Sequence, residues 1–150
     1  GQAKINFINI TNSYCNLNNF GIYDDTLILS DKIPFSYIEF FETLPFYHEL
    51  DNFLLVHGGF NFHIPDPFTD TETMLWTRED DYNSKLAKGK TIIHGHTPTL
   101  PNEVKQMIKQ KANSICIDTG CVFKKIPGLG YLSALNLNTM ELISVYNIDF

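Results

Sequence analysis

The chain has 150 residues, 43% of them apolar, which is enough to bury the core of one domain and argues against a disordered chain. Seventeen acidic and eleven basic residues give a formal net charge of −6, with no run of Lys or Arg, so we expect no nucleic-acid partner. A phosphate ester is not excluded, because bound divalent cations would add positive charge where an anion docks.

Cysteine content and hydropathy bear on the cellular compartment. Cys15, Cys116 and Cys121 form no C-x-x-C pair, which argues against a disulfide framework and a thiolate zinc site. No apolar run approaches the roughly 20 residues of a membrane-spanning helix, and no signal-peptide pattern opens the chain. We therefore predict no membrane association and a cytoplasmic location, unless a signal precedes Gly1.

The first half of the chain predicts loop, helix and hairpin in that order. Residues 1–30 are rich in Asn, Thr and Ser and predict irregular structure. After Pro34, the sequence Ser36-Tyr37-Ile38-Glu39 is typical of a capping box and predicts a short helix that ends before Pro45. Its apolar face would consist of Tyr37, Phe40, Phe41 and Leu44. Residues 46–50 and 53–57 predict a hairpin whose turn residues, Asp51-Asn52, tolerate positive φ angles.

The second half alternates short apolar runs with polar connections. Residues 61–73 predict a surface loop because they are polar and contain two prolines, and order resumes at Met74. Residues 80–90 fit a short solvated helix or a turn equally well. The remaining predicted elements are a strand at 91–94, a tight loop at His96, an amphipathic helix at 102–111, a strand at 115–118 and a hairpin of 131–137 with 142–148.

Polar side chains beside glycine follow three of these apolar strands. His57 follows Leu54-Leu55-Val56, His94-Gly95-His96 follows Thr91-Ile92-Ile93, and Asp118 follows Ile115-Cys116-Ile117. If the strands share one sheet, their ends form one edge, where ligands and catalytic groups of sheet enzymes usually lie. Neutral imidazoles suit Zn, Fe and Mn, so two of them would supply half of a metal site that oxygen ligands complete.

Structural interpretations compete with each of these assignments. A single histidine at a strand end is usually a hydrogen-bonded structural residue. Asp118 opens an Asp-Thr-Gly turn, and a turn role is favoured over a chemical one. Arg78 fits a surface cation or a bidentate phosphate ligand about equally. Trp76 is favoured as a core residue. No function is assigned to the remaining polar candidates, which are His48, His63, Asp66 and Asp70.

Four ordered motifs resemble the calcineurin-like metallophosphoesterase superfamily. The sequence is similar to bacterial serine/threonine protein phosphatases and symmetrical diadenosine tetraphosphatases over most of the chain after about residue 34. The residues that carry the resemblance are Leu55-Val56-His57-Gly58-Gly59, Leu75-Trp76-Thr77-Arg78-Glu79, His94-Gly95-His96-Thr97-Pro98 and Ile117-Asp118-Thr119-Gly120-Cys121.

The resemblance implies an α/β fold, the four-layer α-β-β-α sandwich of metallophosphatases, represented mainly by its second half. It implies that His57 and His96 bind the second of two divalent metals, Mn, Fe or Zn, and that Arg78 contacts the substrate phosphate. His94 would lie near the pocket, in a catalytic role that stays open because eukaryotic phosphatases carry an arginine-bearing sequence there. The substrate would be a phosphoprotein or, alternatively, a dinucleotide polyphosphate.

Three family motifs, of the forms Asp-x-His-Gly, Gly-Asp-x-x-Asp-Arg-Gly and Gly-Asn-His, do not occur in the sequence. We therefore expect residues 1–150 to be the carboxy-terminal portion of the phosphoesterase domain, with the amino-terminal half as its partner. Alone, it should bind metal weakly and be inactive, because two neutral histidines cannot neutralise two cations. It should also self-associate through an exposed apolar face. The alternative is a non-catalytic structural or partner-binding fragment.

Overall fold

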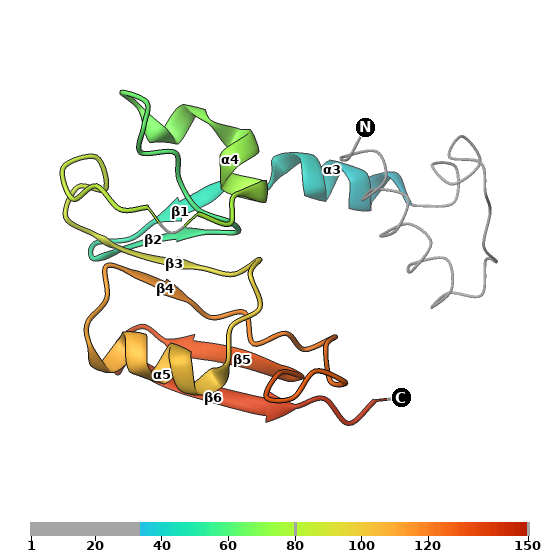
Figure 1. The fold of residues 1–150 in the computed structure, drawn as a ribbon. Helices are drawn as coiled ribbons and strands as arrows, with labels where there is room; N and C mark the ends of the chain where they lie inside the picture. Colours follow the sequence, from blue (N-terminus) through green and yellow to red (C-terminus); the bar gives the residue numbers. More distant parts are fainter. Residues whose placement is uncertain (1–33, 80, 150) are drawn as a thin grey trace. The chain divides into compact units, whose positions relative to one another are not determined.

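The computed structural model describes residues 34–79 and 81–149 (Figure 1). The predictions for residues 1–30 and for Cys15 lie outside the described residues. The chain divides between Leu44 and Pro45 into two compact units.

In the first unit, helix α3 spans Phe35–Thr43. No side chain caps its amino terminus, so the predicted capping box is wrong. The helix begins one residue before Ser36, because the carbonyl of Pro34 already accepts a hydrogen bond from the Tyr37 amide at 2.9 Å. The helix ends before Pro45 as predicted. None of its residues is buried, and the expected apolar face is exposed by 47–60%.

The second unit is built on a mixed four-stranded sheet. Its strands are β1 (Tyr47–Glu49), β2 (Phe53–Val56), β3 (Thr91–His94) and β4 (Ser114–Cys116), in the order β1-β2-β3-β4. Strand β1 is antiparallel to β2, whereas β2, β3 and β4 run parallel to one another. The predicted β1–β2 hairpin is confirmed, but neither residue of its turn has the positive φ that was expected.

Both faces of this sheet are covered, because side chains alternate along β2 and β3. Leu54 and Ile92 face one buried cluster, which also contains Met74 of helix α4 (Thr71–Trp76). Ile93 faces a second cluster together with Val104 of helix α5 (Pro101–Lys109). Strands buried on both faces are typical of parallel sheets, and they explain the short, uninterrupted apolar runs in the sequence.

The predicted loop at 61–73 is shorter and more ordered than expected. It contains the 3-10 helix η2 (Pro67–Thr69), and α4 begins at Thr71 rather than at Met74. Asp66 accepts a hydrogen bond from the Phe68 amide, and Asp70 accepts one from the Thr73 amide, each at 3.0 Å. Both aspartates therefore cap helices, a function the sequence did not indicate. The described part of 80–90 forms turns rather than a helix.

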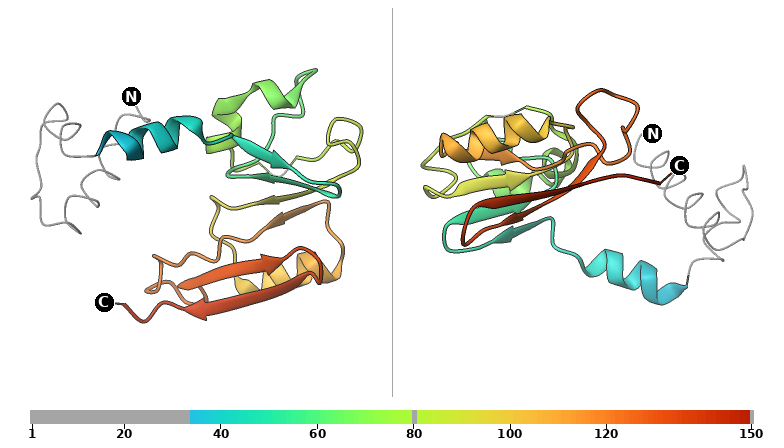
Figure 2. Two further views of the ribbon diagram at one scale, coloured as in Figure 1. Left: turned by 180° about the vertical axis from the view of Figure 1, so that it is seen from behind. Right: turned by 90° about the horizontal axis from the view of Figure 1, so that it is seen from below.

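A second, two-stranded sheet consists of β5 (Tyr131–Asn136) and β6 (Glu141–Tyr146), which form the predicted hairpin (Figure 2). Leu135 and Leu142 pack against the cluster that contains Val104. The other face of the hairpin is apolar and open, with Leu132 67%, Ile143 56% and Val145 64% exposed.

The described residues thus have a mixed α/β fold, in which a four-stranded mixed sheet is accompanied by a small second sheet. Within those residues, every helix is too short or too polar to cross a lipid bilayer.

Candidate functional site

Three parallel strands bring their polar ends to one edge of the sheet, as the sequence predicted. His57 directly follows β2, His94 ends β3, and Asp118 lies two residues beyond β4. Backbone hydrogen bonds continue the register past the strand ends. The Gly95 amide donates to the His57 carbonyl at 2.9 Å, and the Ile117 amide donates to the His94 carbonyl at 2.8 Å. The polar residues are therefore fixed relative to one another by main chain.

The imidazole rings of His57 and His96 meet at this edge. Nε2 of His57 lies 3.0 Å from Nδ1 of His96, and the ring centroids are 4.9 Å apart. An ion bound by two imidazoles at about 2.0–2.1 Å holds neighbouring ligand nitrogens roughly 3 Å apart. The observed spacing therefore fits two ligands of one cation, as well as a hydrogen bond between two neutral rings.

The loop that carries His96 is tight and strained. His96 has φ 68°, in the left-handed region that a side chain with a Cβ adopts at a cost. The Thr97 amide donates to the Gly95 carbonyl at 2.8 Å, which closes the turn. Sγ of Cys116 lies 3.1 Å from the Thr97 carbonyl and 3.5 Å from the Gly95 carbonyl, so the buried thiol secures the same loop from β4.

The environment keeps the His96 ring neutral. Burial, followed by the charges of His57 and Arg78, lowers the pKa of His96, while a hydrogen bond with the Trp76 backbone and the Asp118 carboxylate act in the opposite direction. The net direction is downward, so at neutral pH the ring has the lone pair that a metal ligand requires.

Arg78 and Trp76 accompany the two histidines. Arg78 is exposed, and its charge reaches His96. Trp76 stands edge-on to the His96 ring, with centroids 5.9 Å apart, and is 39% exposed. The prediction that Trp76 belongs to the core is wrong. Helix α4 buries Met74 instead, and Trp76, at the end of the same helix, lies against the site.

The other predicted residues at this edge have structural contacts. Oδ1 of Asp118 accepts a hydrogen bond from the Gly120 amide at 2.9 Å, which is the turn role favoured from the sequence. Nδ1 of His94 lies 3.2 Å from the carbonyl of Gly95. A catalytic role for His94 stays a prediction.

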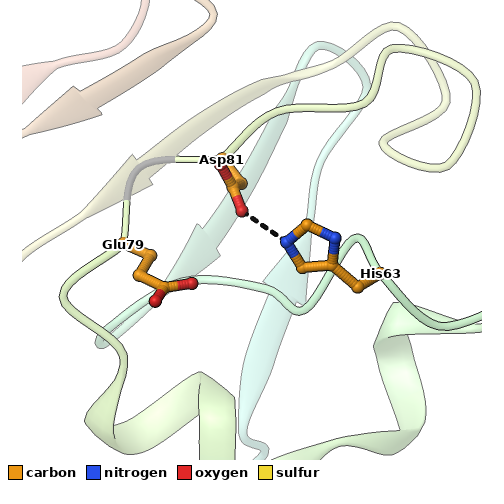
Figure 3. A group of neighbouring side chains, drawn as sticks. All are labelled: His63, Glu79 and Asp81. Atoms are coloured by element: carbon orange, nitrogen blue, oxygen red, sulfur yellow. Dashed lines mark hydrogen bonds and ion pairs between the residues drawn. The ribbon is translucent and has the colours of Figure 1, made fainter.

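Within residues 34–79 and 81–149, only one group of three or more potential ligands has its donor atoms within 4.8 Å of one another: His63, Glu79 and Asp81 (Figure 3). The His57–His96 pair is not part of it, so in the described residues no further His, Cys, Asp or Glu has a donor atom within 4.8 Å of both rings. Sequence reasoning assigned His63 no function, because its partners lie far along the chain. Glu79 and Asp81 stand two positions apart in the sequence, but nothing local connects them with His63.

Comparison of the chain with protein-family models, with curated proteins and with solved structures gives no match.

Proposed function

We propose that residues 45–149 form the histidine half of a two-metal phosphoesterase site of the calcineurin-like type. One observation carries the proposal: Nε2 of His57 and Nδ1 of His96 approach to 3.0 Å at the carboxyl ends of the parallel strands β2 and β3. Arg78 supports it, because its charge contributes to lowering the pKa of His96. When bound, two divalent metals would supply Lewis-acid polarisation of the phosphoryl oxygens and a nucleophile at neutral pH.

The residues of this chain have distinct functions in that proposal. His57 and His96 bind one cation through the two facing nitrogens, and the strained loop holds the His96 nitrogen in place. Arg78 offers a planar pair of donors to the phosphate and stabilises charge that develops on its oxygens. Trp76 packs against His96 and limits the directions in which the ring can turn.

Oxygen ligands must come from elsewhere, because two neutral imidazoles leave the charge of the cation uncompensated. We infer that they belong to an amino-terminal half and that the finer fold is the four-layer sandwich. In that fold, the open apolar face of the β5–β6 hairpin would pack against the remainder of the sandwich. Without the remainder of the sandwich, the chain should self-associate through this apolar face. A compact monomer in size-exclusion chromatography would contradict the assignment of the hairpin to the four-layer sandwich. Free Cys116 and Cys121 suit a cytoplasmic protein.

The test combines metal content with hydrolysis. In the complete protein, His96→Ala should remove bound metal and abolish hydrolysis of 4-nitrophenyl phosphate. His48→Ala, within β1, is the matched control and should change neither. Arg78→Lys should retain metal but lower kcat by roughly a hundredfold, because an ammonium cannot reproduce the fork. Retained activity in His96→Ala would refute the assignment. Replacing the aryl phosphate with a phosphopeptide or a dinucleotide polyphosphate then distinguishes the two substrate classes.

A non-catalytic fragment is the second candidate. The observation that favours it is that, among the described residues, no Asp or Glu forms a group with His57 and His96 in which all donor atoms lie within 4.8 Å of one another. Metal analysis of the purified chain separates the candidates, since a full two-metal complement without any partner would exclude the non-catalytic one.

A further inference from the structure

A separate group of potential metal ligands lies in the loops around α4. Nε2 of His63 lies 2.7 Å from Oδ2 of Asp81, and the carboxylate of Glu79 completes a group whose donor atoms are all within 4.8 Å (Figure 3). His63 precedes η2 and the two carboxylates follow α4, so two segments distant in sequence converge from opposite sides of the group.

These three residues line a cavity of about 500 Å³. Glu72, on the first turn of α4, also lines it, and none of the described lining residues is a Lys or Arg. Among the described residues, three carboxylates therefore share one concave space with a single imidazole. The exposed His63–Asp81 ion pair compensates at most one of them, and such pairs contribute little at the surface.

The donor set indicates the kind of ion. An imidazole together with carboxylates suits divalent cations of the first transition row. Imidazole favours Zn, Fe and Ni, and carboxylates, which also favour Mg and Ca, add Mn to this range. Bonds of about 2.1 Å require donor atoms roughly 3 to 4 Å apart. The donor atoms already lie within 4.8 Å of one another, and all three side chains are exposed, so rotation can bring them to bonding distance without disturbing the core.

We propose that His63, Glu79 and Asp81 bind a divalent transition-metal cation, with Mn²⁺ as the representative ion. This site goes beyond the proposed phosphoesterase centre and shares no ligand with it. The two are joined through Trp76, which lines the cavity and also packs against the His96 ring. A cation bound here would add positive charge near the phosphoesterase site, where an anionic ester is expected to bind, with the Trp76 side chain in contact with both sites.

The experiment isolates this site from the His57–His96 pair. In the double variant His57→Ala/His96→Ala, Mn²⁺ titration followed by the loss of the free-ion EPR signal should give one bound ion per chain. Adding His63→Ala or Asp81→Asn should raise the Kd for Mn²⁺ at least about tenfold, as even the loss of an outer ligand partner does. His48→Ala and Asp51→Asn, added to the same double variant, are exposed controls that should leave the Kd unchanged.

Two results would overturn the proposal: no Mn²⁺ binding in the double variant, or unchanged Kd after His63→Ala and Asp81→Asn. Circular dichroism of each variant verifies folding, and Glu79→Gln provides a third, charge-only change if either of the others unfolds. Failure of the phosphoesterase assay, with binding in the double variant intact, would refute the proposed function and leave this site standing.

Discussion

The positive φ angle of His96 has a free-energy cost that can be measured with a matched pair of substitutions. At φ 68°, alanine in place of His96 keeps the left-handed backbone cost of about 1–2 kcal/mol, whereas glycine removes it. Glycine loses about 0.5–1 kcal/mol through its freer unfolded chain. Both variants lose the same contacts with His57 and Trp76. His96→Gly should therefore be more stable than His96→Ala by about 0.5–1 kcal/mol.

Urea unfolding in chelator-containing buffer measures this difference, because it removes any contribution from bound metal. Gln106, an exposed residue inside α5, provides the control. There the order should reverse, with glycine about 1 kcal/mol less stable than alanine, since a helix interior favours alanine. If His96→Ala were as stable as His96→Gly while the Gln106 pair behaved as expected, the strain at His96 would be refuted.

Three further predictions concern the scaffold of the site. Met74→Ala should lower the free energy of unfolding by about 2–5 kcal/mol, because Met74 is fully buried; a loss below 1 kcal/mol in urea titration would contradict this. Gly58→Ala should destabilise the fold, because an added Cβ would lie 3.1–3.3 Å from main-chain atoms of residues 74–77; an unchanged thermal midpoint would show that they yield. Hydrogen bonds from Asn61 and Thr73 lower the pKa of Asp70 in the folded chain. The ionised side chain therefore stabilises the fold fully above about pH 5, and this stabilisation is lost as the pH falls below about 4. In thermal melts, Asp70→Asn should show a weaker dependence of stability on acid than the parent.

Much of the fold was predictable because local signals agreed with tertiary structure. The strand at 91–94 was placed correctly, since a short apolar run followed by Gly95 has few alternatives. The helix start near Ser36 was not, because a proline carbonyl supplied the first hydrogen bond and left the serine inside the helix. Asp51 and Asn52 can adopt positive φ angles, but neither does so in this turn, so their residue types alone did not determine the turn geometry.

In the candidate site, too, some contacts could be predicted from the sequence and others could not. Parallel strands force their carboxyl ends together, so the meeting of His57 and His96 followed from the strand order and could be anticipated. The contact of Trp76 with His96 depends on how a six-residue helix is rotated, which its sequence does not determine. The meeting of His63 with Asp81 depends on the paths of two loops, and no local pattern records it.

The β5–β6 hairpin has a consequence for synthesis of the chain. Leu135 and Leu142 cover part of the cluster around Ile93, yet the ribosome makes them after every strand of the main sheet. A nascent chain that stops short of residue 131 leaves apolar side chains of that sheet facing water. Prematurely terminated products should therefore bind chaperones that recognise apolar segments, and should be degraded sooner than chains that include the hairpin.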